Sequence, residues 1–308
     1  MDAFSEVLKG VRLNGAMFFN AEFSAPWGLS TPHSRTLAST LALGAQHLVV
    51  YHLVVDGAAR ARLDGGQEVE LSPGDIVVFP HGDPHHLSDG SGLNKVESTA
   101  VMLKIAQRDI SPMRSGGGGA TTRFVCGYLS LDPLLSGPIL ESLPPMLTVN
   151  VRTDPSGHWL EQSILHLVEE AASDRAGSDA MLAKLSEALF VDTLRRFVSG
   201  LPDQTPGWLA GARDAVVGQS LALLHRRADH PWTIAGLAAE VGVSRSALVA
   251  RFARYLSDSP MAYLTGWRLR MAAQALTSSP KGIADIAGAV GYESEAAFNR
   301  AFKRPFGV

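Results

Sequence analysis

Three histidines and the only cysteine of the chain carry side chains that could hold a metal ion: His52, His85, His86 and Cys126. In an alternating strand, His52 shares the face of Val50 and Val54 and is predicted to point into the protein interior. Zinc accepts imidazole and thiolate ligands in a tetrahedral site. The four residues are therefore a candidate zinc site, built from distant segments of the chain.

Two other interpretations of these side chains stay open. The histidines could hydrogen-bond within a β-barrel that binds an organic effector, with Cys126 as a small buried hydrophobic residue. A Cys126 thiolate held by a metal could also be oxidised and release the ion, which would make the domain a redox sensor. Three more residues are candidates for the mouth of an effector pocket: Glu22, Trp27 and His33.

The segments around the histidines are predicted to be short β-strands. Between residues 35 and 110, runs of strand-forming residues alternate with turn sequences such as SPGD and HGDPHH, a spacing typical of a small antiparallel barrel or sandwich. The glycine-rich run Ser115 to Ala120 predicts a mobile loop. From His158 onward, apolar residues recur at helical spacing and predict two amphipathic helices. These helices either pack on the barrel or form a homodimer seam.

An internal repeat occupies the C-terminal part of the chain. Five positions of Ile234 to Gly242 recur 49 residues later in Ile283 to Gly291, and three positions of Ser244 to Phe252 recur 50 residues later in Ser294 to Phe302. Each copy contains a short helix with one apolar face, a turn at glycine, and a serine that can cap a second helix. The pattern predicts two helix-turn-helix units.

The second helix of each unit is predicted to contact DNA bases. Its two buried anchors lie four residues apart, so the residues between them face outward. In a major groove, Arg300 could donate to guanine and Asn299 could pair with adenine, while Val249 and Ala250 could touch thymine methyl groups. The predicted DNA-binding residues are Ser244, Arg245, Ser246, Val249, Ala250, Arg254, Ser294, Glu295, Ala296, Asn299, Arg300 and Lys303.

The apolar stretch Pro260 to Leu276 predicts a helix that connects the two units and holds them at a fixed separation. Two rigidly linked units suit successive major-groove faces about 34 Å apart, so that one subunit would bind a two-part half-site. Four basic residues are candidates for phosphate contacts, or else form an ordinary solvated helix face: Arg251, Arg254, Lys303 and Arg304.

Composition argues against a membrane protein and favours a polyanionic partner. No apolar run reaches the ~18 to 20 residues that a membrane helix needs, and the N-terminal residues lack the features of a secretion signal, so a cytoplasmic protein is expected. A single cysteine cannot form an intramolecular disulfide. Residues 221–308 contain 11 Lys and Arg against 6 Asp and Glu, whereas the rest of the chain is acidic. This segregation of charge suggests a nucleic-acid partner.

The repeat resembles the DNA-binding region of the AraC-type transcription regulators. Three sequences between about Asp214 and Gly307 carry the resemblance, in the family's order and spacing: PWTIAGLAAEVGVSRSALVARF, YLTGWRLRMAAQAL and IADIAGAVGYESEAAFNRAFKRPFG. Family members usually continue with Ser-Pro and a further helical stretch beyond the point at which this sequence ends. The resemblance implies double-stranded DNA as a partner, and RNA polymerase as a second partner if the protein activates transcription.

The N-terminal part resembles the cupin-type sensor attached to one branch of that family. Gly74 to His85 matches the second cupin motif, G(x)5PxGxxH, whereas Val54 stands where the first motif of a metal-binding cupin has its second histidine. The family's usual metal site of three histidines and one glutamate is therefore incomplete. A metal-dependent cupin enzyme, such as an oxygenase or isomerase, is the alternative function, and the incomplete site counts against it. A domain that serves only for dimerisation is a third alternative.

The sequence thus predicts an α+β fold with three parts. Residues 1–150 are expected to form a cupin-like antiparallel barrel, residues 151–205 a helical connector available for dimerisation, and residues 206–308 an all-α domain with two helix-turn-helix units. The predicted protein is not an enzyme but a homodimeric, sequence-specific transcription regulator. A ligand, a metal such as zinc, or a redox signal would control it through the cupin-like domain.

Overall fold

The computed structural model describes residues 4–5, 13–36, 47–91, 95–96, 113–131, 133–153, 155–171, 175–202 and 205–307. The chain divides into two compact units, and the predicted α+β fold is confirmed. The β unit contains Arg12–Asp132 and Leu143–Gly200, and the helical unit contains Met1–Val11, Pro133–Ser142 and Leu201–Val308. Among the described residues, no helix has the length and apolarity required to span a bilayer.

These units differ from the three predicted parts in two places. Residues 133–142 were expected within the N-terminal domain, but they belong to the helical unit, although both flanking segments belong to the β unit. The two helices expected as a separate connector belong to the β unit. Amphipathic periodicity predicts a buried helix face without identifying the surface that buries it, and this is why the sequence left their partner open.

Two sheets form the β unit. The six-stranded sheet has the order β11-β6-β3-β10-β1-β9, with strands β1 (Leu13–Ser24), β3 (His47–Asp56), β6 (Asp75–Phe79), β9 (Met113–Gly116), β10 (Thr121–Leu131) and β11 (Leu147–Asn150). The five-stranded sheet has the order β5-β4-β7-β2-β8, with strands β2 (Gly28–Thr31), β4 (Ala59–Leu63), β5 (Glu68–Leu71), β7 (His85–Ser88) and β8 (Lys95–Val96). Strands pair antiparallel except β1 with β9 and β2 with β8. Within the described residues the sheets remain separate, so the fold is a sandwich rather than a closed barrel.

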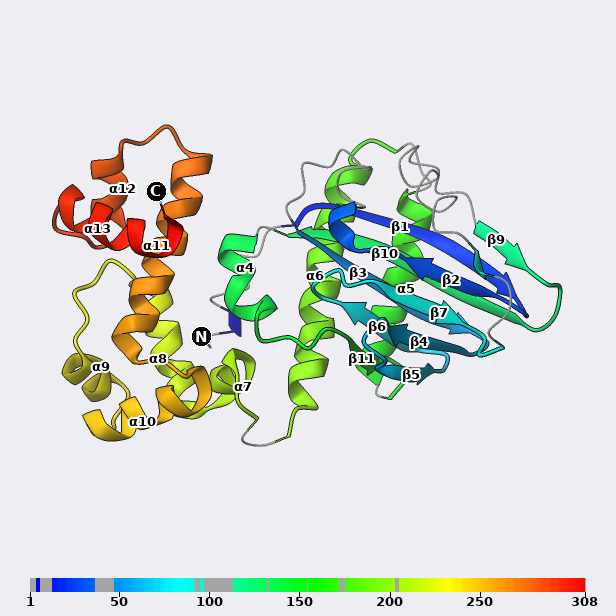
Figure 1. Cartoon of the computed structure of the whole chain (residues 1–308), viewed down its shortest axis with the longest axis horizontal. Helices are drawn as coiled ribbons and strands as arrows, with labels where there is room; N and C mark the ends of the chain where they lie inside the picture. The colour runs from blue at the N-terminus through cyan, green and yellow to red at the C-terminus, as the bar shows by residue number, and fades with distance from the viewer. Residues whose placement is uncertain are drawn as a thin grey trace. The chain divides into compact units, whose positions relative to one another are not determined.

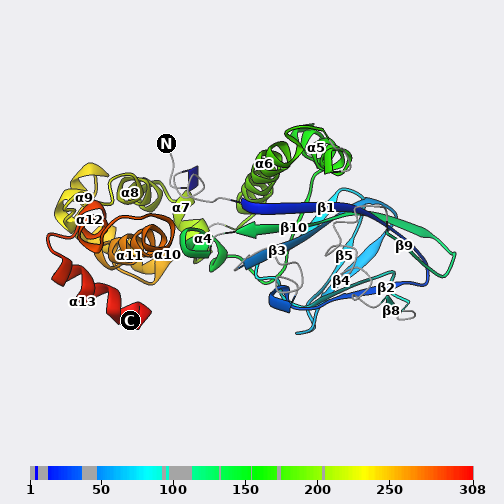
Figure 2. The ribbon, with the colours of Figure 1, turned by 90° about the horizontal axis from the view of Figure 1, so that it is seen from above.

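The core of the β unit lies between the sheets. Along β3, Val50 and Val54 face this core together with His52, as the alternation predicted, whereas Tyr51 faces the opposite side. That opposite side is covered by α5 (Pro155–Ala171) and α6 (Ser178–Ser199), which lie together over β1 and β10 in Figure 2. The two predicted helices therefore pack on the sheet.

The glycine-rich run is part of the sheet architecture rather than a free loop. Its backbone N–H groups at Gly117 and Gly119 donate to the carbonyl oxygens of Ser24 and Ala25, both at 2.8 Å. A Cβ on Gly116 would overlap the carbonyl oxygen of Ser24. The glycines permit this close approach of two backbones, which composition alone could not distinguish from flexibility.

The helical unit is organised around one long helix, α11 (Pro260–Ser278). Figure 1 shows α9 (Ile234–Glu240) and α10 (Arg245–Leu256) near one end of α11, and α12 (Ile283–Ala289) and α13 (Glu295–Phe306) near the other. The remaining helices of the unit are α4 (Pro133–Leu140), α7 (Trp208–Arg213) and α8 (Ala215–Arg226). The carboxylate of Asp214 begins α8 by accepting hydrogen bonds from two backbone N–H groups, at 3.0 and 2.9 Å. Helix α11 carries core residues for both helix pairs.

Candidate functional site

The first helix pair, α9 and α10, has the local structure that the repeat predicted. The hydroxyl groups of Thr233 and Ser244 cap the two helices, each accepting a bond from a backbone N–H three residues further on, at 3.0 and 3.2 Å. Leu237 and Phe252 are fully buried and fix the inner faces. Gly242 ends the turn after α9 with a φ of +68°, which a side chain would disfavour.

The second pair, α12 and α13, repeats this arrangement with one difference at its start. The hydroxyl of Ser294 caps α13 at 3.2 Å, and Ile286 and Phe298 are buried in the core beside α11. Gly291 has a φ of +83° at the equivalent turn. However, Gly282 precedes α12 and provides no side-chain cap.

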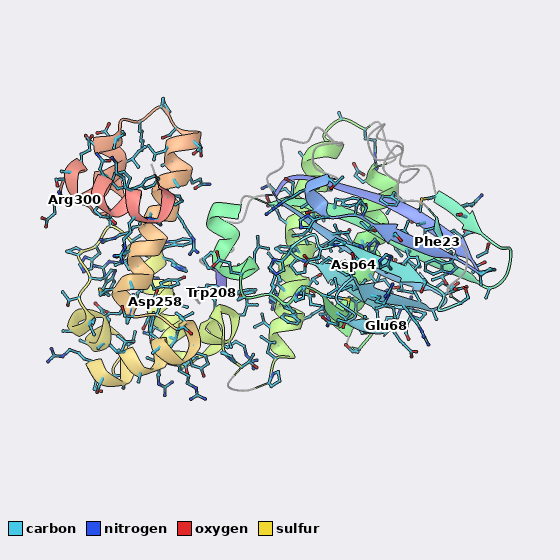
Figure 3. All side chains as sticks on the ribbon, viewed as in Figure 1. Phe23, Asp64, Glu68, Trp208, Asp258 and Arg300 are labelled. Atoms are coloured by element: carbon cyan, nitrogen blue, oxygen red, sulfur yellow. The ribbon has the colours of Figure 1, made fainter. Side chains whose placement is uncertain are left out.

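The predicted DNA-binding residues all lie on the surface of these two pairs. The order of exposure along residues 244–250 is the same as along residues 294–300, with half-buried Val249 and Asn299 at equivalent positions. Arg300 points outward from α13 (Figure 3). Beside α10 there is an open groove of about 860 Å³ that is lined by Trp232, Thr233, Ile234, Ala235, Arg245, Ser246, Val249, Ala250 and Met261.

Arg251, one of the four candidates for phosphate contact, has a partner within the protein. Arg251 was a candidate for phosphate contact, but its guanidinium donates to Asp214 at 2.6 Å. This carboxylate also caps α8, so Arg251 stabilises the junction between α8 and α10. Arg254 and Lys303 are exposed on α10 and α13, and the guanidinium of Arg254 lies over the ring of Tyr255, 5.5 Å from its centroid.

A buried chain of polar groups joins the two sheets of the β unit. His52 on β3 lies opposite Cys126 on β10, and its Nδ1 is 2.9 Å from Cys126 Sγ. The other ring nitrogen, Nε2, is 3.2 Å from Nε2 of His85 on β7. His85 Nδ1 is 2.8 Å from the carbonyl oxygen of Asp83. The ring of His85 stacks on Phe79 with centroids 3.6 Å apart.

In these hydrogen-bonded side chains, only one neutral arrangement of the protons satisfies every contact. The Asp83 carbonyl can only accept, so His85 donates from Nδ1 and accepts at Nε2. His52 must then donate from Nε2 to His85 and accept at Nδ1, where the Cys126 S–H group donates. Burial lowers the pKa of His52 well below its usual value and lowers that of His85 to about 4, while burial raises the pKa of the Cys126 thiol. The side chains of Cys126, His52 and His85 are therefore uncharged at neutral pH.

The four predicted zinc ligands are not brought together. Cys126 and His85 contact opposite nitrogens of the same imidazole, so one ion cannot bind Cys126 together with the facing Nε2 atoms of both histidines. His86 points away from the core, where it contacts Ser30 at 2.8 Å and Asp64 at 2.7 Å. In the described part of the chain, no three His, Cys, Asp or Glu side chains are placed to hold a metal.

The three residues predicted for an effector pocket are also separate from one another. Trp27 is buried, stacks on Phe23 with centroids 4.8 Å apart, and leaves its indole N–H without a partner among the described residues. Glu22 lies on the opposite face of β1 from Phe23 and is 3.9 Å from Arg114. His33 Nδ1 accepts from the backbone N–H of Arg35 at 3.1 Å.

Some residues of these sites escaped the sequence reasoning. Trp232 and Met261 line the groove beside α10, and Arg268 bonds to backbone carbonyl groups outside its own helix. The apolar Trp232 next to a predicted helix start was a usable signal. Backbone acceptors, such as the Asp83 carbonyl, have no signature in the residue type.

Comparison with known proteins agrees with this geometry. The family described as "Cupin" matches residues 2–199, and the family described as "Helix-turn-helix domain" matches residues 237–308. A putative AraC-like transcription regulator of Streptomyces antibioticus is 31% identical over 265 residues, which cover 86% of each chain. The HTH-type transcriptional regulator AlkR of Acinetobacter baylyi is 26% identical, with 99% of this chain and 96% of AlkR covered. The RCS-specific HTH-type transcriptional activator RclR of Escherichia coli is 27% identical, with 100% and 95% covered.

Proposed function

This chain belongs to the AraC-like transcription regulators, and from that premise we propose that it binds a two-part DNA half-site with α10 and α13 in successive stretches of major groove. The observation that carries the proposal is the identical order of exposure along residues 244–250 and 294–300, in two helix pairs that are held by the same helix α11. Two equivalent surfaces on one scaffold suit a duplex that presents its major groove once per turn of about 34 Å.

The exposed residues suggest how each helix discriminates between bases. Arg300 can donate two hydrogen bonds to guanine, and the Asn299 amide matches the edge of adenine. The small apolar surface of Val249 and Ala250 suits thymine methyl groups. Arg254 and Lys303 would contact phosphates and add affinity that does not depend on sequence.

Binding measurements with two arginine variants test this proposal. The full-length protein would first select its site from a random DNA library. We expect Arg300→Ala to weaken binding to the selected DNA by about 1 to 3 kcal/mol and to relax the base preference at one position. Arg254→Ala should weaken binding to selected and random DNA alike and reduce the salt dependence. Equal losses on both DNAs for both variants would contradict the assignment.

We also propose that a signal enters the β unit at the chain formed by Cys126, His52 and His85. The support is that each group depends on its neighbour for a hydrogen bond in a site without water access. Ligation, protonation or oxidation of any member would leave another buried polar group without a partner, at a cost of about 1 to 3 kcal/mol. That free energy is available to shift an equilibrium between conformations.

Variants on β10 separate a signalling role from simple packing. Cys126→Ala removes the donor to His52, Cys126→Ser retains an O–H donor, and Ser130→Ala is a matched control. Ser130 is also buried on β10, but its hydroxyl has no partner among the described residues. We expect Cys126→Ala to differ from the wild type in its DNA affinity and in the response of that affinity to zinc chloride or hydrogen peroxide. Ser130→Ala should match the wild type in both. Identical behaviour of these two variants would contradict the proposal.

Zinc itself is best tested by elemental analysis of the purified protein. The arrangement of Cys126, His52 and His85 does not fit a four-ligand zinc site, so we expect less than one zinc per chain. A stoichiometric zinc that disappears in both Cys126→Ser and His85→Ala would show that these side chains rearrange to bind it.

Dimerisation, and contact with RNA polymerase if the protein activates transcription, complete the proposed function. Helices α5 and α6 bury one face on the sheet, yet Trp159 on α5 and Met181 on α6 remain 53% and 48% exposed. The exposed indole of Trp159 is the surface on which we propose a homodimer contact. Sedimentation of the wild type and of Trp159→Lys tests this, since loss of a dimer only in the variant is the expected result.

A further inference from the structure

The side chain of Arg268 reaches from α11 to the first helix pair. Its Nε donates to the carbonyl oxygen of Ala228 at 2.6 Å, and its Nη2 donates to that of His230 at 2.8 Å. Both acceptors lie in the loop between α8 and α9. This loop is itself ordered by Trp232, whose indole N–H donates to the carbonyl oxygen of Arg227 at 3.0 Å. Arg268 is therefore bonded to the loop that leads into α9 of the first helix pair.

The same guanidinium also meets the second helix pair. A Cβ built on Gly291, in the turn between α12 and α13, would lie 2.7 Å from Arg268 Nη2 and 2.6 Å from the carbonyl oxygen of Asp229. The turn of the second pair thus sits directly against Arg268 and the loop of the first. Burial lowers the pKa of Arg268, as expected for a guanidinium enclosed between these segments.

The neighbours of Arg268 on α11 belong to the two different cores. Trp267 contacts His225 of α8, with ring centroids 4.2 Å apart and ring planes tilted by 33°, whereas Leu269 belongs to the core of α12 and α13. Arg268 therefore lies on α11 between residues that belong to different cores. A planar guanidinium with two bonds resists rotation in a way that a single flexible contact does not.

We propose that Arg268 is a positioning residue that fixes the separation and relative rotation of α10 and α13, and so sets the base-pair spacing that the protein accepts between the two parts of its half-site. This inference rests on the proposed two-part DNA binding. A rigid linkage gives a high effective concentration of the second helix at one spacing, and a loose linkage lowers that concentration while admitting other spacings.

The test uses the full-length protein and DNA selected by the wild type from a random library. Affinities are measured for the selected duplex, for duplexes with one base pair inserted or removed between the two parts, and for a duplex with one part scrambled. We expect the wild type to lose about tenfold in affinity on insertion or removal. Arg268→Gln should bind the selected duplex about tenfold more weakly but bind all three spacings within about twofold of one another.

Matched variants show whether the effect comes from the contacts of Arg268 with the loop before α9 and with the turn at Gly291. Arg270→Gln, two residues away, removes a bond from Arg270 to Glu141 at 3.1 Å and should keep the strict spacing preference. Gly291→Ala should behave as Arg268→Gln does. Gly242→Ala is its control, because both glycines have a positive φ but a Cβ on Gly242 would meet nothing within 4 Å. Circular dichroism and thermal unfolding confirm that each variant is folded.

The possible failures are distinguishable. If scrambling one part of the selected DNA leaves wild-type affinity unchanged, the proposed two-part binding is wrong. If the wild type needs both parts at one spacing and folded Arg268→Gln shows the same strict preference, two-part binding stands and the role of Arg268 is overturned.

Discussion

The two helix pairs share a skeleton but differ in what supports them. In both, a serine caps the outer helix, a glycine makes the turn, and a phenylalanine fills the centre. The first pair packs on α7 and α8 as well as α11, and the ion pair of Arg251 with Asp214 links α10 to the start of α8. The second pair packs on α11 through a smaller core.

The outward-facing residues of a pair and the firmness of its support are therefore separate properties, although a single repeat suggests that they go together. The repeated skeleton determines which residues face DNA, whereas the surrounding helices determine how firmly each pair is held. The surface chemistry has also diverged, since α10 exposes Arg245 and Ala250 where α13 exposes Glu295 and Arg300. The protein therefore presents one backbone geometry twice, with different exposed side chains and different supporting helices.

The largest expected effect comes from removing the central phenylalanine of each pair. Phe252 and Phe298 are 0% and 1% exposed, and truncation of such a residue to alanine costs about 3 to 5 kcal/mol. We expect Phe298→Ala to unfold α12 and α13 locally while α8 to α10 stay protected. Phe252→Ala should reduce protection from hydrogen exchange throughout the helical unit, because α7, α8 and α11 pack in the same core as Phe252.

Hydrogen exchange resolved by segment measures this contrast. Full protection of α8 in Phe298→Ala, together with its loss in Phe252→Ala, is the expected result. Equal loss of protection in α8 for both variants would mean that the two pairs unfold as one unit and that the contrast in support has no consequence for stability.

A smaller effect is expected from acid, and it should affect the first pair. Burial lowers the pKa of His225 to about 3, from 6.5 for the free side chain. Between these values the unfolded chain binds a proton that the folded chain does not, so the free energy of unfolding falls as the pH decreases. The slope is at most about 1.4 kcal/mol per pH unit, which amounts to about 2 kcal/mol between pH 6.5 and 5.

The measurement is exchange of α8 and α11 amides as a function of pH, corrected for the intrinsic rate. His225 Nε2 shares a hydrogen bond of 2.8 Å with the hydroxyl of Tyr263, which also accepts from the indole N–H of Trp208. His225→Phe loses this bond and should be less stable at neutral pH, but its stability should depend less steeply on pH. An unchanged slope in His225→Phe would assign the acid effect to other groups.

The sequence predicted features that depend on neighbouring residues and missed those that depend on distant ones. The repeat identified both helix pairs through their helical spacing, and the capping roles of Ser244 and Ser294 are decided within one turn of helix. Alternation likewise placed His52 in the core. The pairing of His52 with Cys126 arises from the register of two strands 74 residues apart, which no local pattern specifies.

Two other features were hidden for related reasons. Residues 133–142 join the helical unit although they connect two strands of the β unit, and only the folded contacts decide that choice. Arg268 bonds to carbonyl groups, which every residue possesses. The orientation of His86, in contrast, follows from local alternation: it comes directly after His85 and therefore points to the other face of β7, so the two histidines are not both interior ligands.

The smallest effect, and the most direct comparison of the pairs, concerns the caps of α9 and α12. Thr233→Ala removes a hydrogen bond of 3.0 Å to a backbone N–H and should cost about 1 kcal/mol. Gly282→Ser adds the cap that α12 lacks and should stabilise the second pair by a few tenths of a kcal/mol, because glycine is already a tolerable cap. Its φ of −67° suits any residue, and a Cβ there would contact only Asp285 at 3.8 Å.

Urea unfolding, with hydrogen exchange to assign each change to its pair, should show changes of opposite sign in the free energy of unfolding for the two variants. Destabilisation by Gly282→Ser would show that α12 begins with a backbone geometry that a side-chain cap cannot serve, and that the two pairs differ at their starts for a structural reason.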